Sequence, residues 1–206
     1  MDYKQITDTI LAYSDRKDAG VINNLDNFLT VVESRINRKL KTQKQAMRTR
    51  MLVKEGEAYY GLPSDFAGLR DIEIKDDNTT TFHKTMEYAT PAQMNDLSGG
   101  GRYDDIETTY YTIVANQLQI YPVNPNSVLE IVYYQAIAPL TSDTPSNWVA
   151  TAFPDIYIFG GMVEISAFIK DAEAAMLWDK RFVEVIREII DDDKDTRWSG
   201  PPMRIR

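Results

Sequence analysis

The 206-residue sequence predicts an α+β fold: a helical bundle from N- and C-terminal helices, an inserted small antiparallel β domain and an extended C-terminal tail. Three observations lead to this prediction. Apolar residues recur every three or four positions from Ile22 to Leu40, which is typical of an amphipathic helix. Runs rich in tyrosine, valine, isoleucine and threonine follow between residues 110 and 136. A second apolar helical region begins at Pro154.

The N-terminal part of the chain is predicted to be helical. Residues 2–13 have the pattern of a short helix with Ile6, Ile10 and Leu11 on one side, and a polar connector follows. The apolar stripe that comes next predicts one long helix over 21–40. We therefore assign residues 1–44, together with 148–196, to the helical core.

The middle of the chain, residues 45–147, is predicted to form the inserted β domain. Its six β-type segments are 48–53, 58–62, 69–74, 110–114, 118–121 and 128–136. The first two predict a hairpin with Gly56 in its turn. Thr90 and Pro91 predict the start of a brief helix, with threonine as the N-cap and proline in the first helical position.

The C-terminal part returns to helical patterns. Residues after Pro154 are apolar nearly all round, which indicates a buried helix, and Gly160 and Gly161 within it indicate close approach of other helices. A last helix starts near Asp171, with an apolar side that begins at Met176 or Leu177. Three aspartates at 191–193 are expected to end it, because acids oppose the helix dipole there. Residues 197–206 are expected to form an extended tail, since Pro201 and Pro202 exclude helix.

Composition excludes several classes of function. The chain has no cysteine, so it has no disulfide, no thiolate nucleophile and no cysteine-ligated metal. His83 is the single histidine and lacks the spacing of a metal or catalytic motif, so we expect no enzyme activity, no metal and no cofactor. No run of 18 apolar residues predicts a membrane span, and the N-terminus lacks the apolar core of a signal peptide. We expect a protein made in the cytoplasm.

The net charge of −8 conceals three blocks of alternating sign. Residues 35–50 carry seven basic side chains and no acid, whereas residues 171–195 carry nine acids and four bases. Residues 197–206 add three arginines. Alternating blocks predict that oppositely charged surfaces meet, either within the chain or between copies of it. A nucleic-acid-binding accessory protein is the alternative function, although the whole chain is acidic and residues 35–50 contain no aromatic side chain.

The last nine residues combine apolar and stiff side chains with two arginines. The residues concerned are Trp198, Pro201, Met203, Arg204, Ile205 and Arg206. A disordered terminus rarely has this composition, which is typical of an extended segment that docks on a partner. The competing interpretation is a tail that folds back on its own chain.

Taken in order, several sequence pieces resemble the head-to-tail adaptor (head-completion or connector) proteins of short-tailed bacteriophages. They span nearly the whole chain. The pieces are 33–38, 62–66 (Leu-Pro-Ser-Asp-Phe), 88–93, 111–113, 118–122, 133–134, 139–141, 147–148, 154–160, 170–171, Trp178 and 199–206. The resemblance implies a virion structural protein that forms a ring, expected to hold twelve copies, at the head-tail junction.

The resemblance also implies partners. The ring would join the portal protein to the tail nozzle protein and extend the channel through which DNA passes as cargo; tail fibres are a further candidate partner. In such proteins the helical core and the C-terminal segment bind the portal. This implies that Trp198, Pro201, Met203, Arg204, Ile205 and Arg206 dock on it, the arginines by pairing with portal acids.

Contacts between copies are expected from the charge blocks. The basic block would face the acidic last helix of an adjacent copy and set the register of the ring. The residues proposed for this role are Arg35, Arg38, Lys41, Asp179, Glu184 and Glu188. An acidic surface lining the channel would let DNA slide without adhering, because like charges repel.

Overall fold

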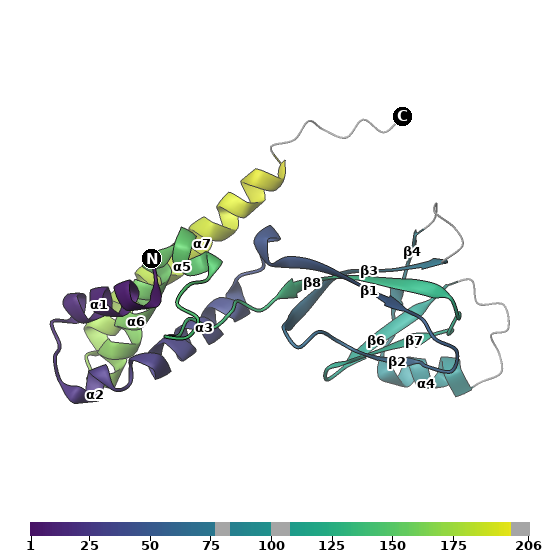
Figure 1. Cartoon of the computed structure of the whole chain (residues 1–206), viewed down its shortest axis with the longest axis horizontal. Coiled ribbons are helices and arrows are strands. Elements are labelled where there is room, and N and C mark those ends of the chain that lie inside the picture. Colours follow the sequence, from purple (N-terminus) through teal and green to yellow (C-terminus); the bar gives the residue numbers. More distant parts are fainter. Residues whose placement is uncertain (77–82, 100–107, 199–206) are drawn as a thin grey trace. The chain divides into compact units, whose positions relative to one another are not determined.

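The computed structural model describes residues 1–76, 83–99 and 108–198 and has an α+β fold (Figure 1). The chain divides into two compact units. The helical unit comprises Met1–Lys44 and Ala136–Arg206, and the β unit comprises Gln45–Gln135. The β unit thus ends twelve residues before the predicted boundary at 147, and residues 136–147 belong to the helical unit.

Six helices build the helical unit. They are α1 (Tyr3–Ser14), α2 (Ala19–Ile22), α3 (Leu25–Lys39), α5 (Trp148–Ala152), α6 (Pro154–Phe168) and α7 (Ala172–Trp198). The prediction of one helix over 21–40 was wrong, because Asn23 and Asn24 separate α2 from α3. The Asn24 side-chain amide donates to the Gly20 carbonyl at 2.8 Å, and such local side-chain bonds compete with a continuous helix.

Helix α6 is the centre of the helical unit, and both of its glycines are close to other helices. A Cβ atom on Gly160 would lie 2.6 Å from a methyl group of Val32 in α3, and one on Gly161 would lie 2.6 Å from the Ile10 side chain in α1. Phe182 of α7 packs on the same side as Val32. The close approach predicted from the glycine pair is therefore confirmed.

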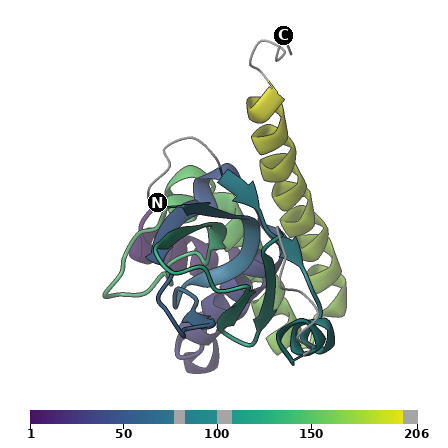
Figure 2. The same ribbon diagram turned by 90° about the vertical axis from the view of Figure 1, so that its right-hand side faces the viewer.

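Helix α7 differs from the prediction at both ends. Its buried side is formed by Phe182, Val185, Ile186 and Ile189, whereas Met176 and Leu177 are 69% and 53% exposed. The helix does not end at the aspartates but runs on through Trp198 (Figure 2). Lys194 pairs with Asp191 at 3.0 Å, which offsets part of the unfavourable charge in the last turns. The tail expected to be extended from 197 therefore begins in helix, while residues 199–206 lie outside the described part.

Two four-stranded sheets form the β unit, in the orders β1-β8-β3-β4 and β2-β7-β6-β5. The strands of the first are β1 (Ala46–Leu52), β8 (Ser127–Gln135), β3 (Phe66–Asp76) and β4 (His83–Thr85). Those of the second are β2 (Tyr59–Gly61), β7 (Gln117–Tyr121), β6 (Tyr110–Val114) and β5 (Glu87–Tyr88). A short 3-10 helix, Gln43–Gln45, precedes β1. One core contains Ile72 and Ile131 from the first sheet and Leu118 and Ile120 from the second, so the sheets pack face to face.

Two details of the β unit correct the sequence analysis. β1 and β2 do not form a hairpin, because β1 pairs with β8 and β2 pairs with β7. The Tyr60 hydroxyl accepts from the Lys54 N–H at 3.2 Å and donates to the Glu57 carbonyl at 2.9 Å. These two bonds fix the backbone of the segment between β1 and β2. In addition, β5 pairs with β6 in parallel, so the second sheet is not wholly antiparallel.

The helix start predicted at Thr90 and Pro91 is confirmed by α4 (Pro91–Gly99). The Thr90 hydroxyl accepts from the Gln93 N–H at 3.3 Å, and the Thr90 N–H donates to the Gln93 side chain at 2.9 Å. These two bonds form a capping box.

The segment that leads from β8 back into the helices is held by side chains of α3. Asn37 accepts from the Ile137 N–H at 2.8 Å, and the Glu33 carboxylate accepts from the Leu140 N–H at 2.6 Å. Glu33 and Asn37 are four residues apart and so lie on one face of the helix. Backbone groups of the returning segment are therefore satisfied in the helical core, which explains why the β unit ends at Gln135.

Glu33 is 8% exposed and lies in a buried polar network. It also accepts from the Tyr157 hydroxyl at 3.2 Å, and that hydroxyl accepts from the Asn147 amide at 2.8 Å. Asn147 caps α5 by accepting from the Ala150 N–H. Burial raises the pKa of Glu33, although the bonds from Leu140 and Tyr157 act in the opposite direction. Burial also raises the pKa of Tyr157.

Gly160→Ala tests the close packing of α6. The added methyl group meets Val32 and Phe182, so we expect a loss of about 1–3 kcal/mol in the free energy of unfolding of the helical unit. All three tryptophans belong to this unit, so their fluorescence during urea unfolding reports on it alone. Gly20→Ala in the same unit is the control, because the atoms nearest to its Cβ position lie 3.3 Å or more away. An equal effect of the two substitutions would contradict the packing argument.

Glu33→Gln tests the buried carboxylate through pH. A group whose pKa is raised by folding stabilises the fold below its unfolded pKa and loses that contribution as pH rises through the folded pKa. The helical unit should therefore gain stability from Glu33→Gln as pH rises above about 4.5, because glutamine keeps the acceptor without the charge. Tryptophan-monitored urea unfolding at several pH values measures this difference.

Glu33→Ala is the contrasting variant, because it leaves the Leu140 N–H and the Tyr157 hydroxyl without their acceptor. We expect it to cost about 1–3 kcal/mol at every pH. A difference between wild type and Glu33→Gln that does not vary with pH would refute the assignment of the pKa shift.

Candidate interaction surfaces

Arg35 of α3 is paired within its own chain. Its guanidinium donates to Asp179 of α7, lies 3.6 Å from Glu164 of α6, and stands 4.5 Å above the Phe182 ring. Arg35 and Asp179 were predicted to contact adjacent copies. In the structure the two side chains pair with each other within one helical unit, and their contact with adjacent copies stays a prediction.

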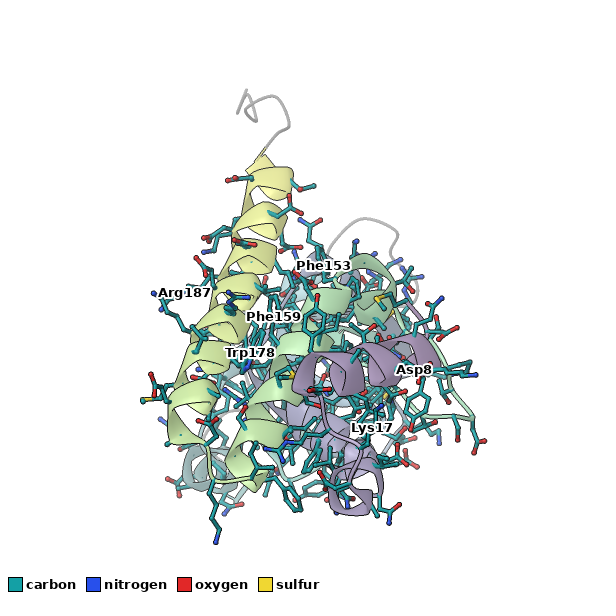
Figure 3. The ribbon with its side chains drawn as sticks, turned by 90° about the vertical axis from the view of Figure 1, so that its left-hand side faces the viewer. Asp8, Lys17, Phe153, Phe159, Trp178 and Arg187 are labelled. Atoms are coloured by element: carbon teal, nitrogen blue, oxygen red, sulfur yellow. The ribbon has the colours of Figure 1, made fainter. Side chains whose placement is uncertain are left out.

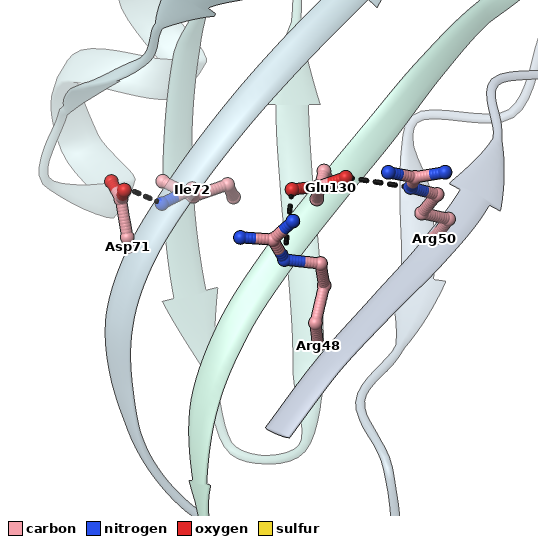
Figure 4. A network of polar contacts seen from close by, with 5 residues as sticks. All are labelled: Arg48, Arg50, Asp71, Ile72 and Glu130. Carbon is pink, nitrogen blue, oxygen red and sulfur yellow. Dashed lines mark hydrogen bonds and ion pairs between the residues drawn. The ribbon is translucent and has the colours of Figure 1, made fainter. Parts of the chain in front are cut away.

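Arg48 and Arg50 project from β1 and flank Glu130 on the neighbouring strand β8 (Figure 4). The Arg48 and Arg50 Nε atoms lie 3.1 Å and 2.6 Å from the two carboxylate oxygens of Glu130. These arginines cover the carboxylate, which is only 7% exposed although it lies on the outer face of the sheet. Opposite charges on adjacent strands stabilise their pairing.

The seven-residue basic block is shared between the two units. Its part up to Lys44 belongs to the helical unit and its last two arginines to the β unit. The Lys44 ammonium lies 5.7 Å from the ring centroids of both Trp148 and Phe153. Burial lowers the pKa of Lys41. Arg35, Arg48 and Arg50 of the block thus pair with carboxylates of their own chain, which reduces the positive charge that this block offers to phosphates.

Exposed charges remain on α3 and α7. Arg38 and Lys39 are exposed at the end of α3, where Arg38 donates to the Ser34 hydroxyl at 3.1 Å. Glu184 and Glu188 are exposed on α7, one turn apart. Figure 3 shows the neighbouring Arg187 pointing away from the helical core. These charges are available to a partner.

An aromatic patch lies where α7 meets α6 and α1. Phe159 stacks on Trp178 with ring centroids 5.8 Å apart (Figure 3), and the ring centroid of Tyr13 lies 6.4 Å from that of Trp178. The Arg181 guanidinium stands 5.1 Å above the Trp178 ring. Together with the exposed Leu177, these residues have the composition of a binding hot spot. Sequence reasoning missed the patch, because its members come from three separate helices.

A small notch opens beside the last turns of α7 in the helical unit. Its volume is about 150 Å³. The lining residues are Thr42, Gln43, Lys44, Trp148, Phe153, Ile189, Asp192, Asp193 and Thr196. The Gln43 N–H donates to Asp193 at 2.7 Å, which fixes one wall against α7. The lining of the notch thus combines two aromatic rings with two aspartates.

No group of three or more metal-ligating side chains lies together among residues 1–76, 83–99 and 108–198. No helix in the described part of the chain is long and apolar enough to cross a membrane. His83 begins β4. Of the predicted docking residues, Trp198 ends α7, whereas Pro201, Met203, Arg204, Ile205 and Arg206 lie outside the described residues.

A family model for the SU10 adaptor protein matches residues 1–206, the whole chain. The chain belongs to the SU10 adaptor family. The resemblance seen in the sequence is thereby confirmed at the level of a bacteriophage head-tail adaptor. No curated protein matches the chain.

Membership of the SU10 adaptor family makes the chain a bacteriophage structural adaptor and a component of the virion. An adaptor acts by contact with other virion proteins. Such families are in general not enzymes. For this SU10 adaptor, the surfaces described above are therefore the features relevant to function.

A charge swap tests whether the Arg35–Asp179 pair acts within one chain. Either Arg35→Asp or Asp179→Arg should lower the free energy of unfolding of the helical unit by about 1–2 kcal/mol, because each brings like charges together. The double variant should recover most of this loss. Differential scanning calorimetry of each variant provides the measurement.

The matched control is an equimolar mixture of the two single variants. Pairing within the chain predicts that mixing gives no recovery, whereas pairing between copies predicts recovery in the mixture. Recovery on mixing would therefore restore the original assignment of Arg35 and Asp179 to the contact between copies.

Proposed function

We propose that this protein forms a ring, of twelve copies, that joins the portal to the tail nozzle of a short-tailed bacteriophage and extends the channel for DNA. The observation that carries the proposal is the match of the whole chain to an adaptor family. The helical unit provides surfaces suited to contacts with other proteins, including the Trp178 patch and the charged faces of α3 and α7.

The C-terminal segment is proposed to dock on the portal. Trp198, Pro201, Met203 and Ile205 would be buried, and Arg204 and Arg206 would pair with acids of the portal. Since α7 runs through Trp198, the helix would present the segment at its end.

Contacts between copies are proposed to use the exposed Arg38 and the half-buried Lys41 of the basic block and the exposed acids of α7. Arg38 and Lys41 would face Glu184 and Glu188 of the adjacent copy. Arg35 and Asp179 are left out, because they pair within one chain. The exposed acids of α7 are candidates for a surface that faces DNA in the channel.

Removal of residues 199–206 tests portal docking. The cut leaves α7 intact, so we expect an unchanged circular dichroism spectrum and loss of co-purification with the portal. Arg204→Ala with Arg206→Ala should weaken binding by about tenfold or more, and Arg204→Lys with Arg206→Lys should weaken it less. Full retention of portal binding by the truncated chain would exclude the segment as the docking element.

Charge reversal tests the contact between copies. Arg38→Glu with Lys41→Glu should reduce assembly in native mass spectrometry, and Glu184→Lys with Glu188→Lys should restore it. Lys17→Glu is the control, because this exposed cation lies between α1 and α2, outside the block. If the reversed chain assembles as well as the control, these residues do not set the register.

A further inference from the structure

The notch beside α7 has the size and chemistry of a site for one apolar side chain flanked by cations. Trp148, Phe153 and Ile189 are among its lining residues, and its volume of about 150 Å³ suits a single aliphatic side chain. Asp192 and Asp193 also line it. Residues 191–195 include four aspartates and one lysine. This end of α7 is therefore acidic, although the Lys44 ammonium lies over the Trp148 ring.

The chain itself contains a segment that matches this site. Residues 203–206, Met-Arg-Ile-Arg, alternate apolar and cationic side chains. In an extended segment alternate residues point the same way, so Met203 and Ile205 would share one side, and the long arginine side chains on the other side can bend back toward carboxylates beside it. The segment therefore matches the lining of the notch in apolar character and in charge.

The length of the segment also allows it to reach its own notch. Thr196, which lines the notch, is two residues before the end of α7 at Trp198. Asp192 lies about 9 Å back along the helix from Trp198 at 1.5 Å per residue. Seven residues link Trp198 to Ile205 and span up to about 23 Å when extended. Gly200 followed by Pro201 is a sequence at which helices end and chains turn.

We propose that, in the free subunit, residues 199–206 bind in the notch of their own chain. Ile205 packs against Trp148 and Phe153, and Arg204 and Arg206 bend back toward Asp192 and Asp193. Tethering favours the chain's own segment over that of another copy, since a short linker gives an effective concentration in the millimolar range. The inference concerns the isolated subunit and stands apart from portal docking, in which the portal would compete for the same residues.

Disulfide trapping tests this placement, and the absence of cysteine makes every introduced pair specific. Gln43→Cys is combined with Met203→Cys, so that a bond reports the segment lying across the notch. Lys194→Cys with Met203→Cys is the matched control, because Lys194 is nearer in sequence but does not line the notch. Products are resolved on a non-reducing gel, and circular dichroism verifies folding.

We expect the Gln43 pair to form an intramolecular bond at least about fivefold faster than the control pair. Asp192→Lys should slow this bond by a similar factor, whereas Asp195→Lys, outside the notch, should slow it much less. Equal rates for the two cysteine pairs, or bonds formed only between chains, would overturn the proposal. Portal binding is not part of this measurement, so its failure would leave the result unaffected.

Discussion

The binding of a returning main-chain segment by one face of α3 is the interaction on which the architecture depends. An inserted unit requires the chain to leave the helical unit and re-enter it at defined places. Glu33 and Asn37 fix the point of re-entry, because their side chains accept hydrogen bonds from the backbone N–H groups of Leu140 and Ile137. Burying a carboxylate is unfavourable unless it is hydrogen-bonded, and here two donors satisfy it.

The same network connects three further parts of the helical unit. Tyr157 links Glu33 to α6, and Asn147 joins Tyr157 to the cap of α5. Around it, the glycines of α6 allow α1 and α3 to approach closely. A polar network that is fully bonded specifies a single arrangement of the helices, which apolar packing alone does less well. This rigidity suits a structural part that must present its surfaces in a fixed geometry.

The sequence allowed the fold class to be predicted because its strongest signals are local. Thr90 and Pro91 mark a helix start through their own chemistry, and Gly160 and Gly161 in an apolar helix indicate close packing. Non-local partners could not be read in this way. Glu33 has the appearance of an ordinary helical acid, so its role in binding 137–140 was missed, and with it the end of the β unit. The β1–β8 pairing joins strands about eighty residues apart, whereas the sequence favoured the nearer β2.

The partners of the residues in the charge blocks were also not predictable from the sequence. Their residues were correctly recognised as unusual, but charge counting cannot tell which partner each side chain has. Arg35 pairs with Asp179, and Arg48 and Arg50 pair with Glu130, in each case inside one chain. What remains exposed on α3 and α7, with the Trp178 patch and the notch, is a smaller and more specific set of surfaces. The division indicates which charges stabilise the fold and which are available to partners.

We propose that this SU10 adaptor forms the ring between portal and tail nozzle. Electron cryomicroscopy of the virion vertex would locate the protein. We expect a ring of this protein below the portal, with the C-terminal segment of each copy against the portal and the nozzle attached beneath. Absence of the protein from the head-tail junction, or a ring that does not touch the portal, would contradict it.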